Sequence, residues 1–369
     1  MKILFIVPIY FEDIEEIKGI HILGGGGRYP FELAKNVLKT GKDDVEIIFF
    51  GKTKSNFMID GIRISVIPAI KLFPKFNGYA NPLPLSVDFF KKIKHADIIH
   101  GIQIRTEAVT LAIIYAKIIG KPIFVTDNGF GGVSLAMLFP FESLTTGVMA
   151  ISKEDYGYWK SKNKYIIYGG VDAKKYVYKR NKEKYILYAG RLVSHKGIDV
   201  LIEAMPKKYK LIIAGNPLDD AYVTYLKKIS KNKNTIFVEK PTDQEMVRLY
   251  RNASCFVLPV TTTDYLGRKW KKSGLYALVV VEAMSCGTPV IVSDVGALPD
   301  FIESNKNGFV FHDRDLNDLN KKISRIIEDK ILAISMGKYC RNIVEKRYDW
   351  KVIAKKVRKI YASCLKTKS

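Results

Sequence analysis

Short apolar runs alternate with helix-like segments along the whole chain. In the first half the runs cover residues 3–7, 45–50, 62–67, 98–99 and 123–125, and a helical pattern covers residues 106–119. Apolar runs without alternating polar residues are typical of parallel strands, which are buried on both faces. The alternation therefore predicts βαβ units around a parallel sheet.

A second series of the same kind begins after a Lys- and Tyr-rich stretch at residues 163–184. It predicts strands at 185–189, 210–214, 236–238, 255–258 and 290–292, helices at 198–205, 221–230, 246–250 and 279–285, and a basic amphipathic helix at 344–365. A chain of 369 residues is long enough for two domains. We expect one domain at residues 1–172, joined by a C-terminal helix at 350–369, and a second domain at 173–349.

The positive charge is unevenly distributed along the chain. Residues 1–172 hold 21 Lys and Arg against 17 Asp and Glu, whereas residues 173–369 hold 39 against 20. The second half therefore favours anionic partners, and polyphosphates, nucleic acid and an anionic membrane surface are candidates. Its lysines do not cluster with aromatic residues on a sheet or on a recognition helix, which argues against nucleic acid.

The sequence has no apolar run as long as a membrane span, and acidic residues follow the first strand where a signal peptide would have its cleavage site. The cysteines are far apart and lack metal-ligand spacing. We therefore expect reduced thiols in a cytoplasmic protein. The cysteines are Cys255, Cys286, Cys340 and Cys364.

A glycine-rich stretch follows the first strand and precedes a helical pattern at 29–38. It includes Gly26, Gly27 and Arg28. Between a strand and a helix, such glycines let the backbone approach a ligand closely, although a flexible linker has the same composition. We expect a ligand-binding turn here.

A second candidate site lies around the helix at 279–285. Tyr276, Ala277 and Leu278 form the turn that opens this helix, and its backbone N–H groups are suited to phosphate. Glu282 lies about one turn further on, and its two oxygens suit the two hydroxyls of a ribose. A solvated or salt-bridged glutamate is the alternative.

Ordered blocks in the second half resemble a known family. They are AGRLVSHKGIDVLIEAM, LIIAGN, VEKPTDQEMVRLYRNASCFVLPV, VVVEAMSCGTPVIVSDVGALPDFIESNKNGFVF and RYDW, and weaker matches in the first half are GGGGRYPFELAK, ADIIHG, KPIFVTDNGF, AISKEDYGYW and IIYGGVD. These blocks resemble family 4 retaining glycosyltransferases of the GT-B fold. The resemblance implies two Rossmann-like domains, the second for a nucleotide-diphosphate sugar donor and the first for an acceptor.

The resemblance also assigns residue roles. Arg191 and Lys196 match the cationic pair that grips the donor diphosphate, and they are expected to carry more of the catalysis than any side-chain base. Glu282 matches the carboxylate on the ribose, and residues 276–278 match backbone donors to the phosphates. No metal or other cofactor is implied, and the DxD-like run at residues 313–315 falls in a polar linker.

The chain departs from the family pattern at two positions. Gly274 stands where the family has a glutamate that contacts the donor sugar, and a basic loop precedes it: Arg268, Lys269, Lys271 and Lys272. We expect this loop to recognise an anionic donor sugar or an acidic acceptor. Asn128, preceded by Asp127, stands where the family commonly has a histidine at the reaction centre. His100 matches another family histidine on the acceptor side, with core packing as its alternative.

The resemblance implies a retaining, metal-independent glycosyltransferase that moves a hexose in glycan biosynthesis. We expect a glycan or lipid-linked acceptor, with peripheral contact to an anionic membrane on its cytoplasmic face. Gly274 and Asn128 leave open a catalytically silent sugar-nucleotide-binding protein of the same fold. A nucleic-acid-binding protein and a GT-B epimerase are the remaining alternatives.

Overall fold

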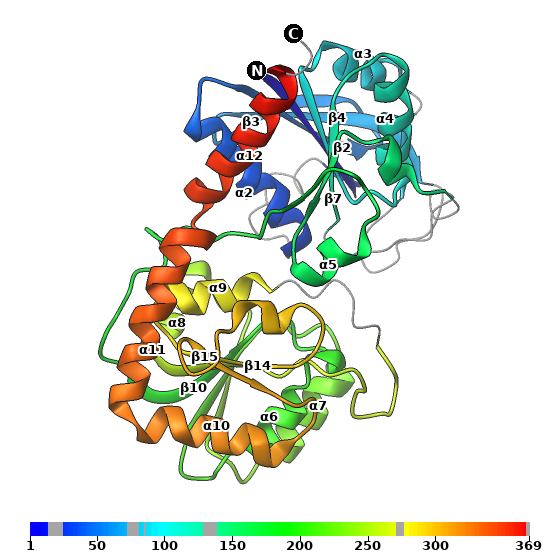
Figure 1. Ribbon diagram of the computed structural model, residues 1–369. Helices are drawn as coiled ribbons and strands as arrows, with labels where there is room; N and C mark the ends of the chain where they lie inside the picture. Colours follow the sequence, from blue (N-terminus) through cyan, green and yellow to red (C-terminus); the bar gives the residue numbers. More distant parts are fainter. Residues whose placement is uncertain (14–24, 72–80, 85, 128–138, 271–276, 367–369) are drawn as a thin grey trace. The chain divides into compact units, whose positions relative to one another are not determined.

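The chain folds into two compact units, Met1–Gly170 with Trp350–Ser369, and Val171–Asp349 (Figure 1). The computed structural model describes residues 1–13, 25–71, 81–84, 86–127, 139–270 and 277–366. Each unit is built on a sheet of mainly parallel strands with helices around it. The expected α/β class with parallel sheets is confirmed.

The first unit has a nine-stranded sheet in the order β3-β4-β2-β1-β6-β7-β8-β9, with β5 paired to β4. All pairs are parallel except β3 with β4 and β4 with β5. The strands are β1 (Lys2–Phe11), β2 (Asp44–Gly51), β3 (Ser55–Ile59), β4 (Ile62–Lys71), β5 (Pro82–Pro84), β6 (Ile98–Ile102), β7 (Ile123–Asp127), β8 (Gly147–Ala150) and β9 (Lys164–Ile166).

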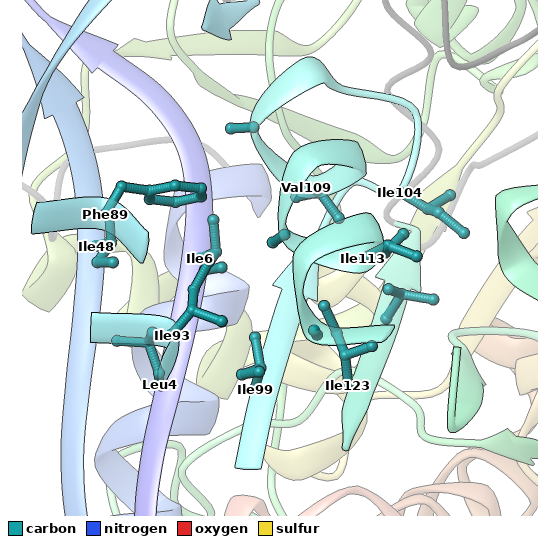
Figure 2. Close-up of a cluster of buried hydrophobic side chains, with 14 of the residues drawn as sticks. Leu4, Ile6, Ile48, Phe89, Ile93, Ile99, Ile104, Val109, Ile113 and Ile123 are labelled. Atoms are coloured by element: carbon teal, nitrogen blue, oxygen red, sulfur yellow. The ribbon is translucent and has the colours of Figure 1, made fainter. Parts of the chain in front are cut away.

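Helices cover both faces of this sheet. They are α2 (Gly25–Thr40), α3 (Val87–His95), α4 (Glu107–Ile118), α5 (Lys153–Tyr158) and α12 (Trp350–Lys366). Figure 2 shows Ile93 of α3 and Ile113 of α4 among strand residues such as Ile99 in one buried cluster. Side chains alternate between the faces of a strand, so His100 points the other way, where its ring meets Tyr361 of α12.

The second unit has six parallel strands in the order β12-β11-β10-β13-β14-β15. The strands are β10 (Glu183–Ala189), β11 (Lys210–Gly215), β12 (Thr235–Glu239), β13 (Ala253–Leu258), β14 (Val290–Ser293) and β15 (Gly308–Phe311). The helices are α6 (Ile198–Ala204), α7 (Asp220–Ile229), α8 (Asp243–Asn252), α9 (Leu278–Ser285), α10 (Leu316–Glu328) and α11 (Lys330–Ile343). Asp and Thr side chains begin several of these helices; Thr242, for example, forms a capping box with Glu245.

The expected single helix at 344–365 is wrong. A five-residue helical turn, Val344–Tyr348, ends at Asp349, and α12 then begins at Trp350. Asp349 has extended backbone angles, φ −67° and ψ 130°. The break has a structural reason, because the chain leaves the second unit at Asp349 and enters the first at Trp350. Among the helices of the described ranges, none is long and apolar enough to cross a membrane.

Candidate functional site

The strand order of the second unit reverses between β10 and β13. The connections from β10 run through β11 to β12 on one side, and the chain then returns to β13 on the other side. Open parallel sheets bind ligands outside the carboxyl ends of the strands at such a switch point. Arg191 and Lys196 follow β10, and α9 with Glu282 follows β13. The topology therefore brings these predicted residues to one edge of the sheet.

The cationic pair lies on the turn after β10. Lys196 ends a 3-10 turn, Ser194–Lys196, and its side chain is partly buried. Burial lowers the pKa of Lys196 to about 8, and the charge of Arg191 acts in the same direction. The positive charges of Arg191 and Lys196 repel each other, and partial burial of Lys196 strengthens this repulsion. An anion bound between them would therefore be stabilised. The turn is suited to a diphosphate.

His195, which the sequence did not single out, lies between the two cations on the same turn. Its ring packs against Trp270 with centroids 4.7 Å apart. Burial, followed by the charges of Lys196 and Arg191, lowers the pKa of His195 to about 3, so the ring is neutral at pH 7. Its Nδ1 is buried and has no hydrogen-bond partner within the described ranges.

The helix α9 supplies the second predicted group. Ala277 is its N-cap and makes no side-chain hydrogen bond to the first turn, where Leu278 begins the helix. The N-terminus of a helix carries partial positive charge and suits an anion. Glu282 is only 4% exposed although it is ionisable. Gly274 and Tyr276 lie outside the described residues.

In the first unit, Gly26, Gly27 and Arg28 are part of α2, which begins at Gly25. The expectation of a glycine turn before a helix at 29–38 is therefore wrong, because the glycines form the first turn of the helix itself. Asp127 is the last residue of β7. β7 pairs with β6, which pairs with β1. Asn128 lies outside the described residues.

His100 lies in the core of the first unit. Its Nδ1 is 2.5 Å from Tyr361 Oη and its Nε2 is 2.8 Å from Thr126 Oγ1. The side chain is fully buried, and burial lowers the pKa of His100 to about 3. Both ring nitrogens are occupied by protein groups, which favours the packing alternative for this histidine.

The DxD-like run makes structural contacts. Asp313 Oδ2 accepts hydrogen bonds from Thr262 N at 2.9 Å and from Thr262 Oγ1 at 2.7 Å. Arg314 donates to Thr263 O at 2.9 Å, and Asp315 caps α10. Within the described part of the chain there is no group of three or more His, Cys, Asp or Glu side chains that could hold a metal ion.

The second unit is similar in sequence to a known family. Residues 172–343 match the family model "Glycosyl transferases group 1". The uncharacterized glycosyltransferase MJ1178 of Methanocaldococcus jannaschii is 29% identical over 345 residues, which are 89% of this chain and 92% of that protein. Sulfoquinovosyl transferase SQD2 of Arabidopsis thaliana is 30% identical over 172 residues, 46% of this chain and 31% of that protein. The chain spans less than half the length of the curated relatives that it matches first.

Solved structures show the fold. Anabaena HepE in complex with UDP and glucose is 18% identical, with 98% of this chain and 100% of that chain covered and a TM-score of 0.70. This likeness extends over both units and confirms the expected GT-B fold. The chain thus has the GT-B fold, and its second unit is similar in sequence to the glycosyl transferases group 1.

Proposed function

We propose that this protein is a retaining glycosyltransferase that moves a sugar from a nucleotide-diphosphate sugar to an acceptor hydroxyl. The observation that carries the proposal is the pair of Arg191 and Lys196 at the switch point of the second sheet. The match of the second unit to the glycosyl transferases group 1 supports the reaction class, and the UDP and glucose bound to HepE support the donor class.

In this proposal the second unit binds the donor. Arg191 forks two diphosphate oxygens and Lys196 supplies a compact charge, each contact being worth about 1.5–3 kcal/mol. The first amides of α9, from Leu278 onward, also face the phosphates, and Glu282 accepts hydrogen bonds from the ribose hydroxyls. Tyr276 and Gly274 complete the expected donor contacts.

Transfer with retention needs no protein base. The bond from the sugar carbon to the diphosphate oxygen breaks while the acceptor oxygen attacks from the same face, and the acceptor proton passes to the diphosphate. Arg191 and Lys196 stabilise the negative charge that develops on the leaving group. Since these cations supply positive charge, and residues 313–315 make structural contacts, we propose metal-independent transfer.

The acceptor side of the proposal rests on the first unit. Gly26, Gly27 and Arg28 begin α2 and Asp127 ends β7, so these four residues lie near the carboxyl edge of the first sheet. That edge is where parallel sheets take ligands. We assign Gly26 and Gly27 to the sugar of the donor, and Arg28 and Asp127 to the acceptor.

The acceptor is proposed to be a glycan or a lipid-linked oligosaccharide on the cytoplasmic face of a membrane. Lys351, Lys355 and Lys359 are exposed and one turn apart along α12, next to the exposed Val352. Such a basic stripe suits an anionic surface. Sedimentation with anionic liposomes tests this, because binding no better than that of an unrelated soluble protein would remove the membrane contact.

The test of the transferase is donor turnover across UDP-, GDP- and ADP-sugars, followed by mass spectrometry and by NMR of the released anomer. One sugar released with retained configuration is expected, with loss of release in Arg191→Ala and Glu282→Ala. Arg248→Ala, which changes an exposed arginine of α8, is the matched control. Donor binding without release, even with glycan and lipid-linked acceptors, would favour the catalytically silent alternative.

A further inference from the structure

A buried carboxylate lies beside residues 191–196, the segment after β10 that carries Arg191 and Lys196 and that we call the cationic turn. Asp264 is only 2% exposed. Its Oδ2 accepts hydrogen bonds from Ser194 Oγ at 3.0 Å, Arg268 Nε at 2.8 Å and Trp270 Nε1 at 3.0 Å. Its Oδ1 accepts from the backbone amides of Leu266 and Arg268, each at 3.0 Å. One carboxylate thus gathers five donors from the loop after β13 and the turn after β10.

The loop after β13 is a built structure, which we call the 262–270 hairpin. Thr263 pairs with Lys269 in an antiparallel bridge, and Trp270 N donates to Thr262 O at 2.8 Å. Gly267 makes the turn with φ +78°. The hairpin is therefore closed by its own backbone, in addition to the bonds that Asp264 accepts.

Two further contacts anchor the hairpin to the rest of the second unit. Asp313 holds Thr262, and the ring of Tyr265 stacks on Tyr225 of α7 at 4.5 Å with an angle of 18°. Neither contact involves the turn that carries Lys196. They fix the hairpin against the body of the unit, so it can serve as a support for the turn.

The hairpin and the residue before it, Thr261, determine where the turn with Lys196 lies. Asp264 holds Ser194, Trp270 packs against His195, and Thr261 N donates to His195 O at 3.1 Å. Ser194 and His195 are the two residues directly before Lys196 in the same 3-10 turn. The position of Lys196 thus depends on contacts with a segment about 70 residues further along the chain.

The cationic turn needs such a support when no anion is bound. Burial is the main cause of the lowered pKa of Lys196, and repulsion by the positive charge of Arg191 adds to it. Burial alone would raise the pKa of Asp264, but hydrogen bonds from Trp270, Arg268 and Ser194 outweigh it and hold the pKa below its usual range. The carboxylate therefore stays ionised at neutral pH and keeps its donors in place.

We propose that Asp264 is a positioning residue of the donor site, which holds the turn of Arg191 and Lys196 in the shape that receives a diphosphate. The inference rests on the proposed function. Asp264 should affect binding of the diphosphate and not binding of the ribose. The hydrogen bonds that it accepts come from the turn with Lys196 and from the hairpin, and not from α9, where Glu282 would hold the ribose.

Titration calorimetry with UDP, GDP and ADP, and with the corresponding monophosphates, tests this proposal. In Asp264→Asn we expect affinity for the best nucleoside diphosphate to fall at least tenfold, with the monophosphate affected much less. Asp313→Asn is the matched control, because it makes the same change of charge beside the hairpin while the amide oxygen of asparagine can still accept from Thr262 and keep the anchor, so its diphosphate affinity should stay within about twofold. Ser194→Ala removes only the link to the turn and should lower the same affinity.

Four results would contradict either the role of Asp264 or the proposed function, and they can be told apart. Equal losses for monophosphate and diphosphate, or an equal loss in Asp313→Asn, would make Asp264 a merely structural group. If Asp264→Asn does not fold, unchanged diphosphate affinity in Ser194→Ala refutes the positioning role. If the wild-type protein binds none of the three diphosphates, the proposed function itself fails.

Discussion

Replacing Lys196 with Met should stabilise the ligand-free protein while lowering its affinity for the donor diphosphate at least tenfold. Methionine keeps the apolar stem of the side chain and removes only the charge. The pKa of Lys196 falls from its ordinary 10.5 to about 8, chiefly through burial and then through Arg191. At about 1.36 kcal/mol for each pH unit, this difference corresponds to about 3 kcal/mol of unfavourable interaction in the folded state. Solvent screening of the partly exposed amine reduces the expected gain to about 1–3 kcal/mol.

The pH dependence of this gain has a definite sign. Between pH 8 and pH 10.5 the unfolded chain holds the proton of Lys196 more tightly than the folded chain does. The destabilisation is therefore fully present below about pH 8 and is relieved as the pH rises toward 10.5. The advantage of Lys196→Met should be large at pH 7 and should shrink at pH 10.

Thermal unfolding of the ligand-free protein at pH 7 and at pH 10 measures this effect. Each kcal/mol should raise the melting temperature of the second unit by about 2–4 °C. Lys207→Met, which removes an exposed lysine of the same unit, should leave it nearly unchanged. A lower melting temperature in Lys196→Met, or the same gain at both pH values, would refute the reasoning.

Three further predictions concern the donor site and the C-terminal helix. Nucleoside diphosphate affinity should fall as the pH rises above about 8, because Lys196 then loses its proton, and Lys196→Arg should shift this fall to higher pH in titration calorimetry. Glu282→Gln should weaken binding of the ribonucleotide, whereas 2′- and 3′-deoxy analogues should lose less affinity from the same change. Arg358→Ala should lower the free energy of unfolding of the first unit by about 1–3 kcal/mol in urea, because the buried Asp43 loses one of its two cationic partners and keeps only the N-terminal amine. The contribution of Asp43 should fade in acid, since burial would raise its pKa but Arg358 and the N-terminal amine outweigh burial and lower it.

The apolar runs predicted most of the strands, because a parallel strand that is buried on both faces consists mainly of apolar residues. The hairpin of β3 and β4 was not predicted, although Asp60-Gly61 stood between two apolar residues as a signal. These two residues have φ +52° and +81°, the left-handed angles that a tight hairpin turn requires. The sequence did not predict the break at Asp349, because the break follows from the passage of the chain from one unit to the other.

The sequence predicted only part of the candidate site. The resemblance, not periodicity, singled out Arg191 and Lys196, and the strand order then explains why they face a ligand edge. The role of Asp264 left no local signal, since a carboxylate in a basic loop has many ordinary partners. Its contact with Ser194 joins positions 70 residues apart and is visible only in the folded chain.

The most direct test of the account is titration calorimetry of UDP, GDP and ADP with the wild-type protein, Arg191→Ala and Lys196→Met. The wild-type protein should bind one of these diphosphates, and each of the two substitutions should lower this affinity at least tenfold, whereas Lys207→Met should not. Equal affinity in all four proteins would place the diphosphate elsewhere and contradict the central claim.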